Sequence, residues 1–406
     1  MKITKVANNT YQLPANVDGF LFEGLWEMPN GVSINSYIIK ADKTAIIDGF
    51  GGWDGAPESL YALLGELEIK PESIEYLIVN HMEPDHSAWI EDFKKINANF
   101  KIVCSQKSAD LLDAFYEHTE NIIIANKDLV LDLGNGHKLK FIDIPNVHWP
   151  DTIATFDTST GVLFSCDAFG SFGKIGEASF DDMLTEDELA FYEEEAVRYY
   201  SNIIGSFSMF VTKAVAKCRE LPIKIIAPGH GIMWRGNPNR IIDDYERYAN
   251  YQKGVAKEEV TIIWGSMYGM TEKAVKLAIK VLEEENMKVN IHQVPGTDMG
   301  TILTSVWNST GVILAMPTYE YKMFPPLAAA LDELGRKKAN GRKAFRFGSY
   351  GWSGGAQKEL DEIMTKYRMN WGFLEPVEFK GNAREEDLQL IEERVKALVA
   401  EVRAVQ

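Results

Sequence analysis

The pattern of hydrophobic and polar positions divides the chain into parts with different periods. Over residues 1 to about 170, short apolar runs such as "TAIIDGF", "EYLIVN" and "GVLFSCD" are bounded by turn residues, which is typical of strands. Between residues 183 and 220 the apolar positions recur at helical spacing, and "IKIIAPGHG" then returns as a strand that ends in a glycine turn. The pattern predicts one α+β unit over this region.

From Val260 onward, strand-like runs alternate with helical segments. The runs "VTIIWGS", "KVNIHQV", "GVILAMP" and "KAFRFGSYG" are separated by segments such as 271–285 and 325–337. Such alternation predicts a parallel, doubly wound α/β sheet. We expect the seam near residues 251–259, where charged residues and a glycine interrupt the periodicity. The predicted domains are therefore 1–253 and 254–406.

Composition agrees with two folded domains and narrows the range of partners. A chain of 406 residues that is 46% hydrophobic is too long for one typical domain and can bury real cores. Its 42 basic residues against 59 acidic ones give a net charge of −17, which opposes binding to nucleic acid or anionic lipid. Through residue 255 there are 22 basic and 38 acidic residues, against 20 and 21 in the remainder, so nearly all the negative charge lies in the first domain.

Other features favour a cytoplasmic protein. No apolar run approaches the roughly 20 residues that a membrane helix requires, and the start "MKITKVANNT" lacks the apolar core of a signal peptide. Cys104, Cys166 and Cys218 lie far apart without C-x-x-C spacing, so we expect neither a disulfide framework nor a cysteine zinc site.

The stretch "NHMEPDHS", residues 80–87, places two histidines and two carboxylates directly after a predicted strand. In an extended segment alternate residues face one way, so His81, Glu83 and Asp85 would point to the same side, and His86 would join them where the chain turns. Taken alone, the motif could also be a polar loop with a helix cap from Asp85, which is the less favoured interpretation. Three more metal-ligating side chains each follow a predicted strand: His148, Asp167 and His230.

The motifs H-x-E-x-D-H, "NVHWPDT", "FSCDAFG" and "APGHG", in this order, resemble the metallo-β-lactamase-like domain of flavodiiron proteins, the A-type flavoproteins. The resemblance covers essentially the whole chain. It implies an α+β metallo-β-lactamase-like αββα domain followed by an α/β flavodoxin-like domain. It also implies two non-haem iron ions, one bound by His81, Glu83 and His148, the other by Asp85, His86 and His230, with Asp167 as the bridge. No catalytic residue is expected beyond these ligands.

The ligand types favour iron over zinc. Hydrolases that share this fold resemble H-x-H-x-D-H, whereas here Glu83 replaces the second histidine. Three carboxylates and four imidazoles form a harder and more anionic site, which suits a redox-active iron pair, while zinc is redox-inert. The remaining histidines, His118, His137 and His292, lie in no comparable setting, so we expect them at the surface or at helix ends, without a role. Trp149, Tyr199 and Tyr200 could line the iron pocket, although core packing is the simpler interpretation.

A second motif lies between the predicted strand "VTIIWG" and the helix that follows it. Backbone amides at the start of the helix, the hydroxyls of Ser266 and Thr271, and the close approach allowed by Gly269 suit a terminal phosphate. An ordinary capped helix would also explain the motif alone. The stretch resembles the flavodoxin phosphate loop, except that Tyr268 stands where a small hydroxyl residue is common.

Two later strand ends, "PTYE" and "SYGWSGGA", are expected at the same edge of the sheet, where ligands of doubly wound sheets bind. By the resemblance these loops enclose the ring of FMN, with Trp352 beside it; the other interpretation of Trp352 is a core anchor. The predicted FMN contacts fall in three loops: Ser266, Met267, Tyr268, Gly269, Met270 and Thr271; Pro317, Thr318, Tyr319 and Glu320; Ser349, Tyr350, Gly351, Trp352, Ser353 and Gly354.

The resemblance implies an oxidoreductase that reduces dioxygen to water, nitric oxide to nitrous oxide, or both, at the diiron centre, with electrons supplied through FMN. The family's assembly is a head-to-tail homodimer or a dimer of such dimers. The sequence ends at residue 406 without a C-x-x-C pair, so we expect no fused rubredoxin module and an external donor: rubredoxin, a flavin reductase or a reduced deazaflavin. The basic stretch 335–346 could guide an acidic donor, or it could be a solvated turn.

Two other functions stay open at this point. A zinc hydrolase with a flavodoxin-like domain would cleave an ester or thioester and ignore redox state. An FMN electron carrier with a merely structural metal site would accept electrons without consuming gas. The identity of the bound metal separates the first from the diiron reductase, and gas consumption separates the second.

Overall fold

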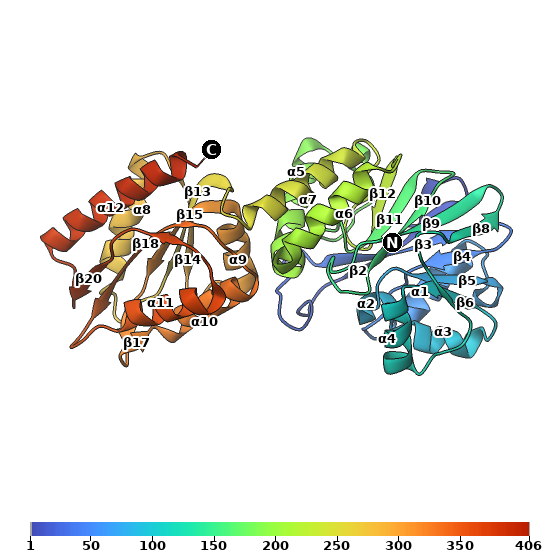
Figure 1. Cartoon of the computed structure of the whole chain (residues 1–406), viewed down its shortest axis with the longest axis horizontal. Helices are drawn as coiled ribbons and strands as arrows, with labels where there is room; N and C mark the ends of the chain where they lie inside the picture. Colours follow the sequence, from blue (N-terminus) through green and yellow to red (C-terminus); the bar gives the residue numbers. More distant parts are fainter. Residues whose placement is uncertain (1, 406) are drawn as a thin grey trace. The chain divides into compact units, whose positions relative to one another are not determined.

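The computed structural model describes residues 2–405, which form two compact units (Figure 1). The first unit comprises the residues up to Tyr200 together with Met209–Glu246, and the second comprises Ser201–Ser208 and the residues from Arg247 onward. The outer limits of the two predicted domains, residues 1 and 406, lie outside the described residues. The segment Ser201–Ser208 thus belongs with the second half of the chain.

Two sheets face each other in the first unit. Within the described residues, one sheet has the spatial order β1 to β7, antiparallel as far as β4 and parallel from there on. The other has the order β12-β11-β10-β9-β8, antiparallel except for the β11–β12 pair. Their strands are β1 (Thr4–Ala7), β2 (Thr10–Val17), β3 (Val32–Ile39), β4 (Ala45–Ile47), β5 (Tyr76–Val79), β6 (Lys101–Cys104), β7 (Ile122–Ile124), β8 (Val130–Gly134), β9 (His137–Asp143), β10 (Ile153–Asp157), β11 (Val162–Cys166) and β12 (Ile225–Pro228).

Apolar side chains from both sheets form the core between them, for example Ile78 and Val103 from one sheet and Phe141 and Phe164 from the other. β5 and β11 are buried along their whole length because both of their faces are covered, which explains their unbroken apolar runs. This central core places the ends of β5 and β11 next to each other in the interior, where polar side chains need partners.

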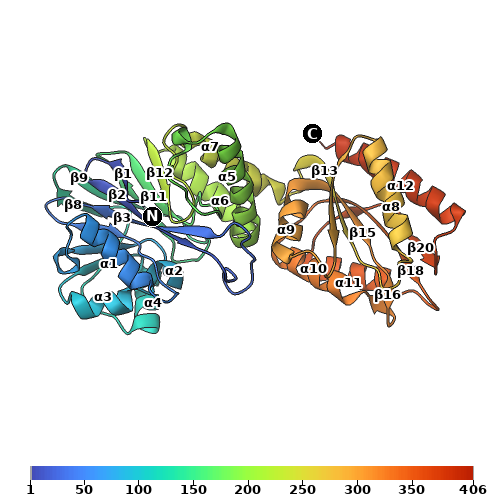
Figure 2. The same ribbon diagram turned by 180° about the vertical axis from the view of Figure 1, so that it is seen from behind.

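Helices cover the outer face of each sheet. A second core packs the β1–β7 sheet against one group of helices: α1 (Ala56–Glu66), α3 (Ile90–Ile96) and α4 (Gln106–Tyr116). Figures 1 and 2 both show α5 (Glu186–Tyr199) and α6 (Ser208–Arg219) beside β11 and β12, on the side away from α1. The first unit is therefore an αββα sandwich.

Helix starts in this unit follow from local sequence. α4 begins after Ser105, whose hydroxyl accepts a hydrogen bond from the backbone N–H of Ser108. α5 begins with a capping box in which Thr185 and Glu188 each accept from the other's backbone N–H.

The second unit holds a parallel sheet in the order β14-β13-β15-β18-β19, with β20 also paired to β18. Numbered by position in the chain this is the order 2-1-3-4-5 of a doubly wound flavodoxin-like sheet, whose connections change direction between β13 and β15. The strands are β13 (Lys257–Trp264), β14 (Lys288–Gln293), β15 (Ser309–Ala315), β18 (Lys343–Tyr350), β19 (Gly372–Phe373) and β20 (Val377–Lys380).

Helices pack on both faces of this sheet (Figures 1 and 2). One face forms a core with α8 (Glu272–Glu284) and α12 (Glu385–Arg403), and the other is covered by α9 (Met299–Asn308), α10 (Pro325–Arg336) and α11 (Ala356–Tyr367). Within residues 2–405, no helix combines the length and the apolar character that crossing a bilayer requires.

Candidate functional site

Ends of strands in the first unit bring together the side chains of the seven predicted metal ligands. β5 leads through Asn80 into His81 and the short helix α2 (Pro84–Ser87), while the other ligands follow β9, β11 and β12. Asp85 is half-buried and the other six are buried. The group consists of His81, Glu83, Asp85, His86, His148, Asp167 and His230.

One half of the cluster is built around two imidazoles and two carboxylates. Glu83 Oε2 lies 2.9 Å from His148 Nε2 and 3.3 Å from His81 Nε2. Asp167 Oδ2 lies 3.1 Å from His148 Nε2 and 3.3 Å from His81 Nε2. Both imidazoles therefore direct Nε2 to the same point.

The other half has the same composition. Asp167 Oδ1 lies 3.0 Å from His86 Nε2 and 3.4 Å from His230 Nε2. Asp85 Oδ2 lies 3.5 Å from His86 Nε2 and 3.4 Å from His230 Nε2, and these two nitrogens are 3.1 Å apart. Asp167 thus presents one oxygen to each half.

These distances fit two metal ions. Metal–ligand bonds of about 2.0–2.2 Å place adjacent donor atoms roughly 3 Å apart, which is the spacing found here. Among the described residues, both oxygens of Asp85 and Oδ2 of Asp167 are buried without a hydrogen-bond partner. Buried carboxylate oxygens of this kind need a compensating cation.

A pocket with a volume of about 320 Å³ reaches Glu83 and Asp85. Its walls include the apolar side chains of Phe22, Ile34 and Trp53. A small uncharged molecule could therefore approach the cluster along an apolar surface.

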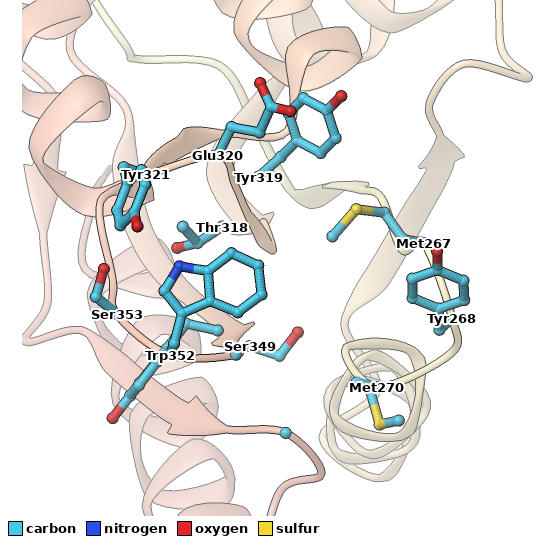
Figure 3. A pocket seen from close by; sticks show the side chains of 13 residues that line it. Met267, Tyr268, Met270, Thr318, Tyr319, Glu320, Tyr321, Ser349, Trp352 and Ser353 are labelled. Atoms are coloured by element: carbon cyan, nitrogen blue, oxygen red, sulfur yellow. The ribbon is translucent and has the colours of Figure 1, made fainter.

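A second pocket, with a volume of about 440 Å³, lies in the other unit at the edge of the sheet where the strand order reverses (Figure 3). We call it the switch-point pocket. Figure 3 shows Met267 and Met270 on one side and Trp352 on the other. It is lined by Met267, Tyr268, Met270, Thr318, Tyr319, Glu320, Tyr321, Ser349, Tyr350, Gly351, Trp352, Ser353 and Gly381.

The remaining predicted FMN contacts, Ser266, Gly269, Thr271, Pro317 and Gly354, belong to the same loops but are not among the lining residues. The hydroxyl of Ser266 accepts the N–H of Gly269 at 2.9 Å, and Gly269 has φ +82°, a conformation that suits glycine. Thr271 Oγ1 lies 2.9 Å from the hydroxyl oxygen of a serine in the third loop. The first bond closes the turn within one loop, and the second ties the first loop to the third at the start of α8.

Comparisons with known proteins decide the family. The family model described as "ODP family beta lactamase" matches residues 32–231. The chain is similar to the anaerobic nitric oxide reductase flavorubredoxin of Vibrio vulnificus, with 33% identity over 346 residues that make up 84% of this chain and 68% of that relative. The chain belongs to the flavodiiron protein family.

Solved structures agree with the flavodiiron assignment along the whole chain. The flavodiiron protein from Giardia intestinalis is 25% identical with a TM-score of 0.91, over 100% of this chain and 98% of that one. A flavoprotein from Thermotoga maritima is 29% identical with a TM-score of 0.89, over 99% of both chains. The fold predicted from sequence, a metallo-β-lactamase-like domain followed by a flavodoxin-like domain, is confirmed.

Electrostatics in the cluster shift the pKa values of several of its groups. Burial lowers the pKa of His148, but the nearby carboxylates of Asp167 and Glu83 outweigh this effect and raise the value to about 9. Burial likewise lowers the pKa of His230, and Asp167 and Asp85 raise it to about 10. Burial raises the pKa of Glu83, whereas its histidine partners lower it to about 2. A bound metal ion would replace the protons on these imidazoles.

Side chains behind the cluster orient its imidazoles. His81 Nδ1 lies 3.4 Å from Asp151 Oδ1, and the other oxygen of Asp151 accepts the N–H of Met82 at 2.9 Å and the hydroxyl of Ser108 at 3.2 Å. Nδ1 of His230 lies 3.0 Å from the carbonyl oxygen of Ser33. Partners at Nδ1 leave Nε2 to face the metal position.

A buried network fixes the strand end that carries His81. The carboxylate of Asp48 accepts the backbone N–H of Asn80 at 2.8 Å and its side-chain amide at 3.0 Å, and Thr155 donates to Asn80 Oδ1 at 2.7 Å. Burial raises the pKa of Asp48 to about 6. Sequence reasoning missed Asp48, Asn80 and Asp151, although Asp48 closes the run "TAIID" and Asp151 follows His148 in "NVHWPDT".

Two of the three aromatic residues that could line the metal pocket do contact ligand imidazoles. The ring centroids of Trp149 and His81 are 5.0 Å apart, and those of Tyr199 and His230 are 5.5 Å apart. The hydroxyl of Tyr199 is buried and has no hydrogen-bond partner among the described residues. A π-helical turn at residues 200–204 follows, an irregularity frequent at functional sites.

Tyr200 and the other histidines are not part of the cluster. His137 and His292 are nevertheless buried and lie on β9 and β14, so the expectation of surface or helix-end positions is wrong for these two. Tyr200 packs against Tyr245. His137 bonds to a buried aspartate at 2.7 Å, His292 lies 2.8 Å from a serine hydroxyl, and His118 stacks on a phenylalanine ring.

Two features of the second unit bear on alternatives that the sequence left open. Trp352 is 74% exposed, which excludes the alternative that it anchors the core. In the basic stretch 335–346, Arg342 is fully buried and donates to the carbonyls of Val306 and Tyr251, and burial lowers its pKa to about 9. Arg336 pairs with a carboxylate on its own helix. The stretch therefore offers less free positive charge to a donor than its sequence suggests.

Proposed function

We propose that this flavodiiron chain reduces dioxygen to water, nitric oxide to nitrous oxide, or both. The observation that carries the proposal is the two-part cluster in which Asp167 directs one oxygen to each half. Family membership supports it, because relatives at 33% identity are named anaerobic nitric oxide reductase. The apolar pocket that reaches Glu83 and Asp85 suits an uncharged diatomic gas.

The proposed metal is a pair of non-haem iron ions. His81, Glu83 and His148 would hold one ion, Asp85, His86 and His230 the other, and Asp167 would bridge them. The three carboxylates supply the negative charge that suits iron, and Glu83 is the residue that distinguishes this set from a histidine-rich zinc site. Asp151 and the Ser33 carbonyl hold two of the imidazoles in their ligating orientation.

FMN is the proposed second cofactor, bound in the switch-point pocket. The phosphate would lie at the start of α8, near Ser266 and Thr271, where backbone N–H groups favour an anion. The ring would lie between Met267 and Trp352. A reduced flavin and a reduced iron pair together supply the four electrons that dioxygen requires, and two nitric oxide molecules require two.

Further parts of the proposal concern organisation. We propose functional domains at 1–253 and 254–406, a cytoplasmic location and an external electron donor, either rubredoxin, a flavin reductase or a reduced deazaflavin. We also propose a head-to-tail homodimer, alone or as a dimer of dimers, in which the FMN of one chain serves the iron of its partner.

Gas consumption by the reduced protein tests the function. Purified protein is analysed for iron, zinc and FMN, then reduced without oxygen and mixed with dioxygen or nitric oxide in separate runs. We expect iron, FMN and rapid consumption of at least one gas. Zinc in place of iron together with esterase or thioesterase activity would show a hydrolase instead.

Replacement of the bridging carboxylate separates a reductase from an electron carrier. Asp167→Ala removes the oxygen that each half of the cluster shares, so we expect iron content and gas consumption to fall by at least about tenfold while FMN stays bound. Asp157→Asn is the matched control, because Asp157 is a buried aspartate that bonds to His137 outside the cluster. Full gas consumption by the Asp167→Ala protein would overturn the proposal.

A further inference from the structure

The loop after β15 forms a hairpin with an uncommon turn. β16 (Thr318–Tyr319) pairs with β17 (Lys322–Met323), and the two residues between them, Glu320 and Tyr321, have φ of +45° and +62°. Positive φ at both positions is typical of a type I′ turn, which normally contains asparagine and glycine. Longer side chains adopt this conformation only when surrounding structure holds them in it.

The strained residues are the ones that face the switch-point pocket. Tyr319, Glu320 and Tyr321 all line it, and Figure 3 shows them along one border, with Trp352 beneath. The Tyr321 ring also makes an edge contact with Trp352, with ring centroids 6.4 Å apart. Glycine would relieve the strain but would remove this wall.

Helix α11 holds the hairpin from behind. In a two-residue hairpin the pair next to the turn exchanges the hydrogen bonds, so the N–H of Met323 faces away from β16 and needs another acceptor. Glu359 Oε2 accepts it at 2.6 Å, and Glu359 Oε1 lies 3.7 Å from the ammonium of Lys322. Glu359 thus binds both residues of β17.

One helical turn earlier, α11 makes a backbone contact with the same turn. A Cβ at Gly355 would lie 2.0 Å from the carbonyl oxygen of Tyr321, so only glycine allows the helix to begin there. Gly355 therefore contacts the second residue of the turn and Glu359 contacts the two residues that follow it, so α11 holds the C-terminal side of the turn through two adjacent contacts.

We propose that Glu359 is a positioning residue for cofactor binding. It holds the Glu320–Tyr321 turn in its strained conformation before the cofactor binds. The free energy needed to order this side of the switch-point pocket is then not lost from the binding free energy. The identity of the cofactor, FMN, rests on the proposed function, whereas the role of Glu359 in the hairpin rests on its contacts alone.

Rebinding of FMN to the flavin-free full chain tests the inference. Glu359→Ala removes both contacts, and we expect the Kd for FMN to rise about tenfold, because the lost bond has a charged acceptor. Glu359→Gln keeps an oxygen acceptor for Met323, so its Kd should stay within about threefold of the original value. Glu362→Gln is the control, because Glu362 also lies 3.7 Å from the Lys322 ammonium but is not bonded to Met323.

Amide hydrogen exchange of the flavin-free proteins gives a readout that does not depend on FMN. We expect faster exchange over residues 318–324 in Glu359→Ala and unchanged exchange in Glu362→Gln. Unchanged FMN affinity and unchanged exchange in Glu359→Ala would overturn the inference, as would an equal loss of affinity in Glu359→Gln. Failure of the unaltered protein to bind FMN would instead refute the flavin part of the proposed function and leave the exchange result decisive for Glu359.

Discussion

Glu83 is the residue at which this chain departs from the histidine-rich pattern of hydrolases with the same fold. Its carboxylate contacts both imidazoles of one half of the cluster, at 2.9 Å and 3.3 Å. A carboxylate at position 83 makes the site more negative while the other six ligands stay the same. The preference for one metal over another therefore depends strongly on this residue.

Glu83→His should therefore shift the metal content from iron towards zinc. With equal iron and zinc offered to metal-free protein, we expect the bound iron-to-zinc ratio to fall by at least about tenfold, because imidazole adds no negative charge and suits zinc well. Elemental analysis measures the ratio. Glu72→His, at an exposed position outside the cluster, serves as control, and an equal ratio in both variants would contradict the argument.

Tyr199 gives a second test at this scale. Tyr199→Phe removes a buried hydroxyl that has no partner among the described residues, so the free energy of unfolding should stay the same or rise by up to about 1 kcal/mol. We expect gas consumption to fall, because the phenol lies beside His230 and is available to donate a hydrogen bond to a polar group there. Thermal unfolding and gas consumption are measured on the same samples.

Tyr245→Phe is the matched control for this experiment. The Tyr245 hydroxyl donates to the Gly170 carbonyl at 2.7 Å, so its loss should cost about 1 kcal/mol of unfolding free energy. A Tyr199→Phe protein that is destabilised to the same extent, with unchanged gas consumption, would show that the phenol only packs.

Sequence reasoning found the seven clustered residues because each stands at a strand end and belongs to a recognisable order of motifs. It missed Asp48, Asn80 and Asp151 because their importance comes from partners far away in the chain, such as Thr155 for Asn80. Core packing was preferred for Tyr199 over a place at the metal pocket because aromatic residues are usually buried, and no local pattern marks a hydroxyl without a partner.

At the scale of elements, long strands and helices were predictable and short ones were not. The apolar runs of β13, β15 and β18 made the parallel sheet evident, whereas the two-residue strands β16, β17 and β19 carry too few positions to show a period. The hairpin at Glu320–Tyr321 lacks the asparagine or glycine that normally marks such a turn. Tertiary contacts from α11 replace that local signal.

The contact between α9 and β14 should make the free energy of unfolding depend on pH. Burial lowers the pKa of His292, whose Nε2 lies 2.8 Å from the Ser305 hydroxyl; nearby Asp298 opposes the shift only in part. Since the unfolded imidazole has a pKa of about 6.5, the unfolded state binds the proton more readily, and stability falls as the pH drops through that value.

His292→Gln removes this proton-binding site. We therefore expect the unfolding free energy of the variant to decrease less than that of the original protein between about pH 7.5 and pH 5.5. Denaturant titrations at several pH values measure the difference. Equal decreases in the two proteins would show that His292 titrates alike in the folded and unfolded states.

At the scale of the whole molecule, the change of period near residue 260 indicated an α+β unit followed by a doubly wound sheet, and the order of motifs supplied the two named folds. Neither could show that Ser201–Ser208 belongs with the second unit. That membership depends on contacts such as the Gln252 side-chain amide donating to the Gly205 carbonyl at 3.0 Å, which no periodicity encodes.

The proposed head-to-tail dimer predicts complementation between two inactive variants. Asp167→Ala lacks a working metal centre, and Ser266→Glu should lose FMN because its carboxylate repels the phosphate. Co-expressed, they form hybrid dimers in which the FMN of the first chain serves the iron of the second. We expect about a quarter of full gas consumption, because half of randomly formed dimers are hybrids with one of two working sites.

Separate expression of each variant provides the baseline for the mixture. Each alone should be inactive, with metal and FMN contents measured directly. A mixture no more active than its components, despite hybrid dimers recovered through two different affinity tags, would mean that each chain's FMN serves its own iron.

Because the two halves of the cluster share one carboxylate, the binding of one metal ion should affect the binding of the second. An ion in one half would fix Asp167 in the orientation that the other half requires, so a second ion would meet an arranged site and bind more tightly than the first. When iron is scarce, molecules would then be either complete or empty, with few in between. The availability of iron would set how many copies work and would leave the quality of each working copy unchanged.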